Sequence, residues 1–185
     1  QIGYSPEEFA KIIIEKEGGF SNAKGLYDKS ALKESSYHPL PLESGSAGDK
    51  YSNILNKIFT KDYDFKDYDR AANIYWPGNK IGLGREDIIS FWESLKNILS
   101  DVKFKVEHVG YLDEPNKNPR ASIRWSLEGI HSGDSEMYGK KTNSNLYFMG
   151  INHAELNSYG VIREWVLFDE VAIWKQILMN KNNNE

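Results

Sequence analysis

The spacing of hydrophobic residues divides this chain into a helical first part and a strand-rich second part. A capping box, Ser-Pro-Glu-Glu at residues 5–8, begins a short helix that two glycines end at residues 18–19. Residues 20–50 show little periodicity and are predicted to be mostly loop. Helical spacing returns in residues 51–59 and again in residues 84–99, so we predict two further helices there.

After Asp101 the spacing of apolar residues changes from about 3.6 to about 2, the period of a strand with one buried face. Asn-Ser-Tyr-Gly at residues 157–160 is typical of a hairpin loop. Asp169 is predicted to cap a terminal helix, which ends in a polar tail at residues 181–185. Five strands are predicted in all, at residues 72–76, 104–110, 121–131, 146–157 and 161–168.

Helices followed by a run of long antiparallel strands are typical of an α+β layout. We therefore predict a cone-shaped, curved antiparallel sheet whose inner face is covered by the N-terminal helices, with a further helix at the C-terminus. We divide the chain into an N-terminal helix and loop extension, residues 1–50, and a cone domain, residues 51–185. A cone of this kind encloses a cavity, and small-molecule sites favour such concave, mostly apolar places.

The composition is that of a folded protein, and it excludes several classes of function. Hydrophobic residues make up 39% and charged residues 27% of the 185 residues, which is not the composition of a disordered chain. Twenty-three Lys and Arg against 27 Asp and Glu give a net charge of −4, so we expect neither nucleic acid nor a membrane as partner. The absence of cysteine excludes a disulfide framework, a thiolate zinc site and a cysteine nucleophile.

The cellular compartment stays unknown at this level. A chain without cysteine suits either redox environment, and the cytoplasm is our default expectation. The chain begins at Gln1 rather than at a methionine, so we expect that some upstream sequence has been removed.

Five segments carry a resemblance to a known family. They are Gly-Arg at residues 84–85 leading into 88–92, Val-Glu-His-Val at 106–109, residues 124–133, residues 160–165, and Phe-Asp-Glu at 168–170 followed by Gln176. In order and spacing, over about residues 51–179, they resemble the SnoaL-like polyketide cyclases, a branch of the nuclear transport factor 2-like superfamily. The resemblance implies the cone fold, a homodimer formed by open sheets that pair face to face, and chemistry without metal or cofactor.

In those cyclases an aspartate on the last strand removes a proton from an activated carbon. Counting back from Gln176 and Asp169 places that position on Val166, which cannot accept a proton. Glu164 lies two residues earlier on the same strand face and is our leading catalytic candidate, because burial beside Ile162 and Val166 would raise its pKa towards the range of a general base. The alternative is an ordinary ion pair of Glu164 on a solvated face.

His153 is the second catalytic candidate, since pairing of the last two strands could bring it opposite residues 162–166 as a general acid. The alternative is a structural histidine bonded to a backbone carbonyl. Four histidines on four separate segments lack the spacing of metal ligands, so we expect no metal site. The predicted ligand-binding residues, which suit a small apolar or aromatic ligand, are Tyr75, Trp76, Trp92, His108, Trp125, His131, Val166 and Phe168.

Two functions from different classes stay open. The first is a cofactor-independent enzyme that acts by acid–base catalysis on a carbonyl-bearing or polycyclic compound, with Glu164 as base and His153 assisting. The second is a non-catalytic small-molecule binding domain, which Val166 at the cyclase base position favours. A third, a protein-interaction module, predicts a cavity filled by side chains and a large exposed apolar patch.

Overall fold

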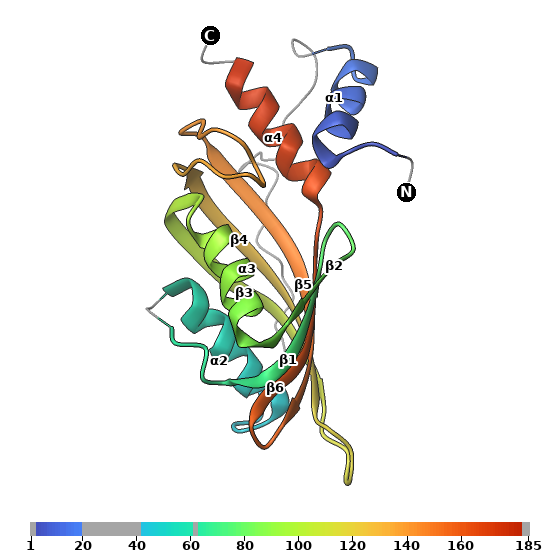
Figure 1. Ribbon diagram of the computed structural model, residues 1–185, viewed down its shortest axis with the longest axis vertical. Helices are drawn as coiled ribbons and strands as arrows, with labels where there is room; N and C mark the ends of the chain where they lie inside the picture. Colours follow the sequence, from blue (N-terminus) through green and yellow to red (C-terminus); the bar gives the residue numbers. More distant parts are fainter. Residues whose placement is uncertain (1–2, 20–41, 61–62, 183–185) are drawn as a thin grey trace.

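A six-stranded sheet carries helices on one face and a helical pair at one end (Figure 1). This computed structural model describes residues 3–19, 42–60 and 63–182. Residues 20–41 of the predicted loop and 183–185 of the predicted tail lie outside those ranges, and residues 47–50, predicted as loop, are the first turn of a helix. The elements in chain order are α1 (Pro6–Lys16), α2 (Ala47–Thr60), β1 (Tyr68–Trp76), β2 (Lys80–Leu83), α3 (Gly84–Lys96), β3 (Leu99–Leu112), β4 (Arg120–His131), β5 (Asn145–Asn157), β6 (Gly160–Phe168) and α4 (Glu170–Asn182).

The sheet has the order β2-β1-β6-β5-β4-β3 and is mixed rather than purely antiparallel. Strands β3 to β6 form an antiparallel meander, β1 pairs with β2 antiparallel, and β1 runs parallel to β6. The prediction of an entirely antiparallel sheet was wrong at this one pair, because periodicity along a strand carries no information about its neighbour's direction. The predicted α+β cone, an open curved sheet covered by helices, is confirmed.

Two helices cover the concave face of the sheet. α2 packs on β3 and β4, and α3 packs on β1. α2 turns Tyr51, Leu55 and Ile58 towards the sheet at helical spacing, and all three are fully buried. Opposite them, the ring of Trp125 lies against Gly150 of the neighbouring strand, where an added Cβ would be only 2.2 Å from the ring. A larger residue than glycine at this position would therefore push the Trp125 ring out of the core.

The remaining helices, α1 and α4, lie side by side at one end of the sheet (Figure 1). The predicted capping box of α1 is confirmed: the Ser5 amide donates to Glu8 over 2.7 Å, and the Glu8 amide donates to the Ser5 hydroxyl over 3.2 Å. Asp169 accepts a bond from the amide of Ala172 over 3.0 Å, as predicted for a helix cap. Within the described ranges no helix is long and apolar enough to cross a membrane. The division at residue 50 stays a prediction.

Candidate active site

A β-bulge sets the orientation of Glu164. Leu156 pairs with Val161 and Glu155 pairs with Arg163, so Ile162 is an extra residue in β6. Past this bulge Glu164, Val166 and Phe168 face the core, whereas Ile162 is only half-buried. Glu164 therefore points inward as predicted and none of its side chain is exposed, whereas Ile162 at the bulge is less buried than the alternation predicted.

Four elements bring a neutral hydrogen-bond donor to the Glu164 carboxylate. The Tyr51 hydroxyl on α2 donates to Oε1, and the Tyr68 hydroxyl on β1 lies 3.1 Å from both oxygens. The indole N–H of Trp92 on α3 donates to Oε2 over 3.4 Å, and the Asn152 amide on β5 donates to Oε1 over 3.0 Å. Within the described ranges no lysine, arginine or histidine pairs with Glu164, so the carboxylate is held by dipoles alone.

Asn152 connects this cluster to the rest of the core. Its side-chain oxygen accepts a bond from the Trp125 indole over 2.8 Å, and its amide nitrogen also donates to the Tyr51 hydroxyl over 2.9 Å. The register places Asn152 opposite Val166, beside the inward-facing Ala154 that pairs with Glu164. Asn152 therefore fixes the positions of Tyr51, Trp125 and Glu164 together.

Burial governs the proton affinities in this cluster. Loss of hydration raises the pKa of Glu164 to about 6, although the bonds from Tyr51, Tyr68, Trp92 and Asn152 lower it. Burial and the nearby carboxylate raise the pKa of both tyrosine hydroxyls well above their usual range. The tyrosines consequently stay protonated as donors, while Glu164 can gain or lose a proton near neutral pH.

Four of the predicted ligand-binding residues lie in the core around this cluster: Trp92, Trp125, Val166 and Phe168. Trp92 contacts Glu164 directly, and Phe168 packs edge-on against Trp125 with ring centres 6.3 Å apart. Trp76 is half-buried and stacks on Phe91 with ring centres 4.9 Å apart. These aromatic rings make the interior of the cone apolar around one polar cluster.

The structure does not bring the other predicted site residues to Glu164. His153 pairs with Trp165, not with the 164 position, and lies exposed on the outer face of the sheet with its ring 5.4 Å from the Trp165 ring. Tyr75 stacks on the same tryptophan at 5.5 Å. Pairing of β5 with β6 does bring His153 opposite residues 162–166, as predicted, but on the outer face and away from Glu164. Apolar residues occupy both faces of β5, so its pattern does not reveal which face is inside.

His108 and His131 are also separated from the carboxylate. His108 is exposed on β3. His131 is fully buried at the end of β4, where Nδ1 lies 3.2 Å from the Thr142 hydroxyl and Nε2 has no partner among the described residues. Burial lowers the pKa of His131, which favours its neutral form.

Sequence reasoning missed Tyr51, Tyr68 and Asn152. Asn152 carried a usable signal, because it is a polar residue at an inward position of β5, between Gly150 and Ala154. Tyr51 and Tyr68 gave no such signal in the sequence, because each occupies a position where any large apolar residue would fit the pattern. Within the described ranges no group of three His, Asp or Glu side chains could hold a metal ion.

Comparison with known protein families and with curated proteins finds no match. Comparison with solved structures finds a proposed SnoaL-like polyketide cyclase from Jannaschia sp. CCS1, with a TM-score of 0.57, 14% identity, and coverage of 74% of this chain and 97% of that one. A second proposed SnoaL-like polyketide cyclase, from Shewanella putrefaciens CN-32, has a TM-score of 0.56 and 17% identity over 71% of this chain and 84% of its own. IdmH, a proposed polyketide cyclase from Streptomyces antibioticus, has a TM-score of 0.55 and 16% identity over 70% and 96%. At these identities the likeness shows the fold alone: the chain has the SnoaL-like fold of the nuclear transport factor 2-like proteins.

Proposed function

We propose that this protein is a cofactor-independent acid–base enzyme, in which Glu164 removes a proton from a carbon beside a carbonyl group of a carbonyl-bearing or polycyclic compound. One observation supports this most: the Glu164 carboxylate is buried in the cone, its donors among the described residues are all neutral, and burial raises its pKa to about 6. A base with such a pKa is ionised at neutral pH and is stronger than an ordinary carboxylate.

In the proposed reaction the carboxylate takes the proton, and the electron pair of the C–H bond moves onto the carbonyl oxygen to form an enolate. Glu164 becomes a neutral acid, the form that its burial favours. The Tyr68 hydroxyl on β1, no longer bonded to a carboxylate, donates to the enolate oxygen. The enolate carbon then attacks an acceptor or regains the proton from Glu164.

Access to Glu164 requires movement, because none of its side chain is exposed. Tyr51 is the covering group on α2, and its hydroxyl must leave the carboxylate before a substrate carbon can approach within about 3 to 3.5 Å. We therefore propose that α2 moves away from the sheet when substrate binds. The small apolar or aromatic ligand expected from the sequence would then be held by Trp92, Trp125 and Phe168.

A specific observation also favours a non-catalytic binding domain. The count back from Gln176 and Asp169 puts Val166, which is buried, at the position of the cyclase base. The four donors also bond Glu164 as a structural carboxylate would require. In that case the polar cluster holds α2, α3 and the sheet together, and the cone binds a ligand without changing it.

Hydrogen exchange in a panel of carbonyl compounds separates the two functions. Each compound is incubated in D2O with the protein, and loss of the C–H signal beside the carbonyl is followed by NMR. Glu164→Gln should lower the exchange rate by at least about 100-fold while the affinity for the compound is kept. Glu136→Gln, an exposed glutamate in the β4–β5 loop, is the matched control and should exchange as the wild type does. Saturable binding without exchange by the wild type would support the binding domain, and unchanged exchange by Glu164→Gln would refute its role as base.

We also propose that the protein forms a homodimer through the outer face of its sheet. Met149, Ile151 and Leu167 are 60%, 47% and 65% exposed there, and they line an apolar groove of about 550 Å³. An apolar surface of this kind is typical of an interface. Leu167→Lys should shift the mass measured by light scattering from dimer to monomer; a wild type that is monomeric at all concentrations would refute the proposal.

A further inference from the structure

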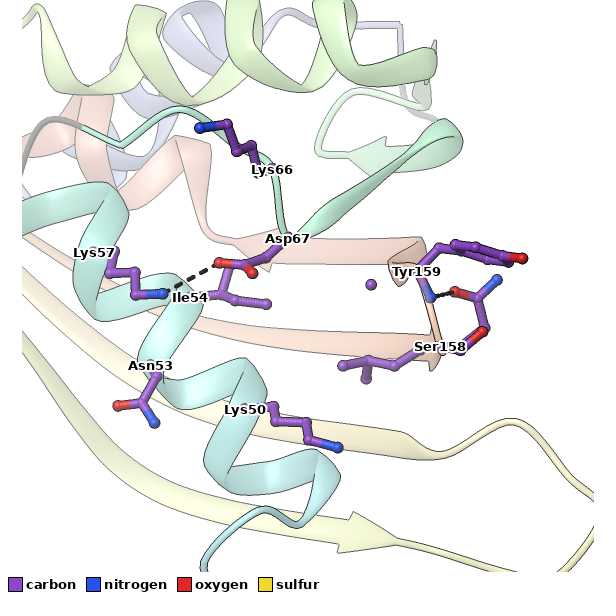
Figure 2. A pocket seen from close by; sticks show the side chains of 11 residues that line it. Lys50, Asn53, Ile54, Lys57, Lys66, Asp67, Ser158 and Tyr159 are labelled. Carbon is purple, nitrogen blue, oxygen red and sulfur yellow. Dashed lines mark hydrogen bonds and ion pairs between the residues drawn. The ribbon is translucent and has the colours of Figure 1, made fainter.

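A second concave site lies outside the cone, between α2 and the turn that joins β5 to β6 (Figure 2). Its volume is about 420 Å³. We call it the α2 groove. It is lined by Lys50, Asn53, Ile54 and Lys57 from α2, by Lys66 and Asp67 before β1, and by Leu156, Asn157, Ser158, Tyr159 and Gly160.

One face of α2 supplies a whole wall of the groove. Its four lining residues follow at positions i, i+3, i+4 and i+7, the spacing of neighbours on a helix surface. The two lysines at the ends of this row are therefore about 10 Å apart along the helix axis. Figure 2 shows Ile54 between them, with the tip of the β5–β6 turn as the opposite wall.

The groove is cationic in a protein whose net charge is −4. Two of its three lysines are already paired: Lys57 with Asp67 at 3.2 Å, and Lys66 with Asp64 at 2.5 Å. The Lys50 ammonium has no ion-pair partner among the described residues, and it is exposed at the rim. The groove thus presents one uncompensated positive charge.

The groove exposes some apolar carbon beside its polar groups. Ile54 and Leu156 line it but are only 4% and 5% exposed, so they offer a ligand little surface. On the opposite wall Tyr159 is 76% exposed, so its ring is available to cover a ligand. A single free cation beside apolar carbon favours a ligand with one negative charge and a hydrocarbon part.

We propose that the α2 groove binds an organic carboxylate, whose charged group pairs with Lys50 and whose hydrocarbon part lies on the exposed ring of Tyr159. A phosphate would carry more charge than one free ammonium neutralises, and no arginine lines the groove to bind it with two parallel bonds. The site is separate from Glu164, so this proposal does not depend on the function proposed above.

Amide chemical shifts of the isotope-labelled protein test the proposal, with octanoate as the probe and acetate, octanol and inorganic phosphate as comparisons. Octanoate should shift the amides of α2 and of residues 156–160 saturably, because those residues line the groove. Acetate lacks the apolar part and octanol lacks the charge, so each should bind at least about tenfold more weakly. Phosphate should cause no saturable shift at these residues.

Two variants locate the charge. Lys50→Glu should weaken octanoate binding by about tenfold or more, and Lys50→Met, which keeps the length of the chain, should weaken it as well. Lys140→Glu makes the same charge change in the exposed β4–β5 loop, at the other end of β5, and should bind octanoate as the wild type does. The proposal is overturned by equal affinity in the Lys50 variants, by shifts confined to other parts of the protein, or by phosphate binding in the groove.

Discussion

The burial of Glu164 predicts an unusual dependence of stability on pH. In the folded protein its pKa is about 6, whereas an ordinary glutamate, as in the unfolded chain, has 4.5. Because the folded value is the higher one, the folded state holds this proton more tightly. The stabilisation is complete below about pH 4.5 and is lost as the pH rises through about 6.

The size of the effect follows from the two pKa values. A tenfold change in proton affinity is worth about 1.4 kcal/mol, so Glu164 should lower the free energy of unfolding by about 2 kcal/mol between pH 4 and 7. Other groups also titrate in this range. Glu164→Gln removes only the one proton, and the difference between wild type and variant therefore isolates Glu164 from the rest.

Urea unfolding at a fixed protein concentration measures this difference at each pH. The free energy of unfolding of the wild type minus that of Glu164→Gln should fall by about 2 kcal/mol from pH 4 to 7. Glu136→Gln, at an exposed position, should give a difference that does not change with pH. A difference for Glu164→Gln that does not change with pH would show that the pKa of Glu164 is ordinary. A difference that rises with pH would show that its hydrogen-bond donors lower the pKa more than burial raises it.

Three further predictions concern other buried polar groups. Tyr51→Phe removes one donor from the Glu164 carboxylate, so it should raise the pKa measured by carboxyl NMR titration and cost about 1 to 3 kcal/mol in urea unfolding. His131→Asn should reduce the loss of stability between pH 7 and 5, because burial lowers the pKa of the histidine and its protonation favours the unfolded chain; equal pH profiles would contradict this. Glu17→Ala should destabilise the fold more than Lys175→Met does, since the side chain of Lys175 is 7% exposed and that of its partner 41%; equal losses in thermal unfolding would count against it.

Hydrophobic spacing predicted most elements of the fold, and its failures have local causes. β3 begins at Leu99 rather than near residue 104, because Asp101 has a positive φ of 51° and a register shift between Ser100 and Lys103 interrupts the alternation. β2 was missed because a strand of four residues is too short to show a period. The parallel pairing of β1 with β6 depends on how distant segments meet, which no local pattern encodes.

The candidate site was predicted only in part for the same reason. Alternation in β6 identified Glu164 as inward-facing, and a buried carboxylate is informative on its own. Its donors Tyr51 and Tyr68 are 113 and 96 residues away in the chain, so only the packing of α2 and β1 brings them together. A buried carboxylate requires a hydrogen-bonding partner, so the sequence predicts that Glu164 has one, but the local pattern does not identify the residue.

The bulge at Ile162 determines whether this protein has a polar cluster in its core at all. Strand faces alternate, so without one extra residue the positions after Val161 would exchange faces. Arg163 and Trp165 would then point into the cone, and Glu164 would lie on the outer face beside the side chains that now surround His153. The inward direction of Glu164 therefore comes from one inserted residue in β6 and not from the two-residue step between Val166 and Glu164 alone. A carboxylate placed in this way lies on the same inward face as Val166, two residues further from the C-terminal end of β6.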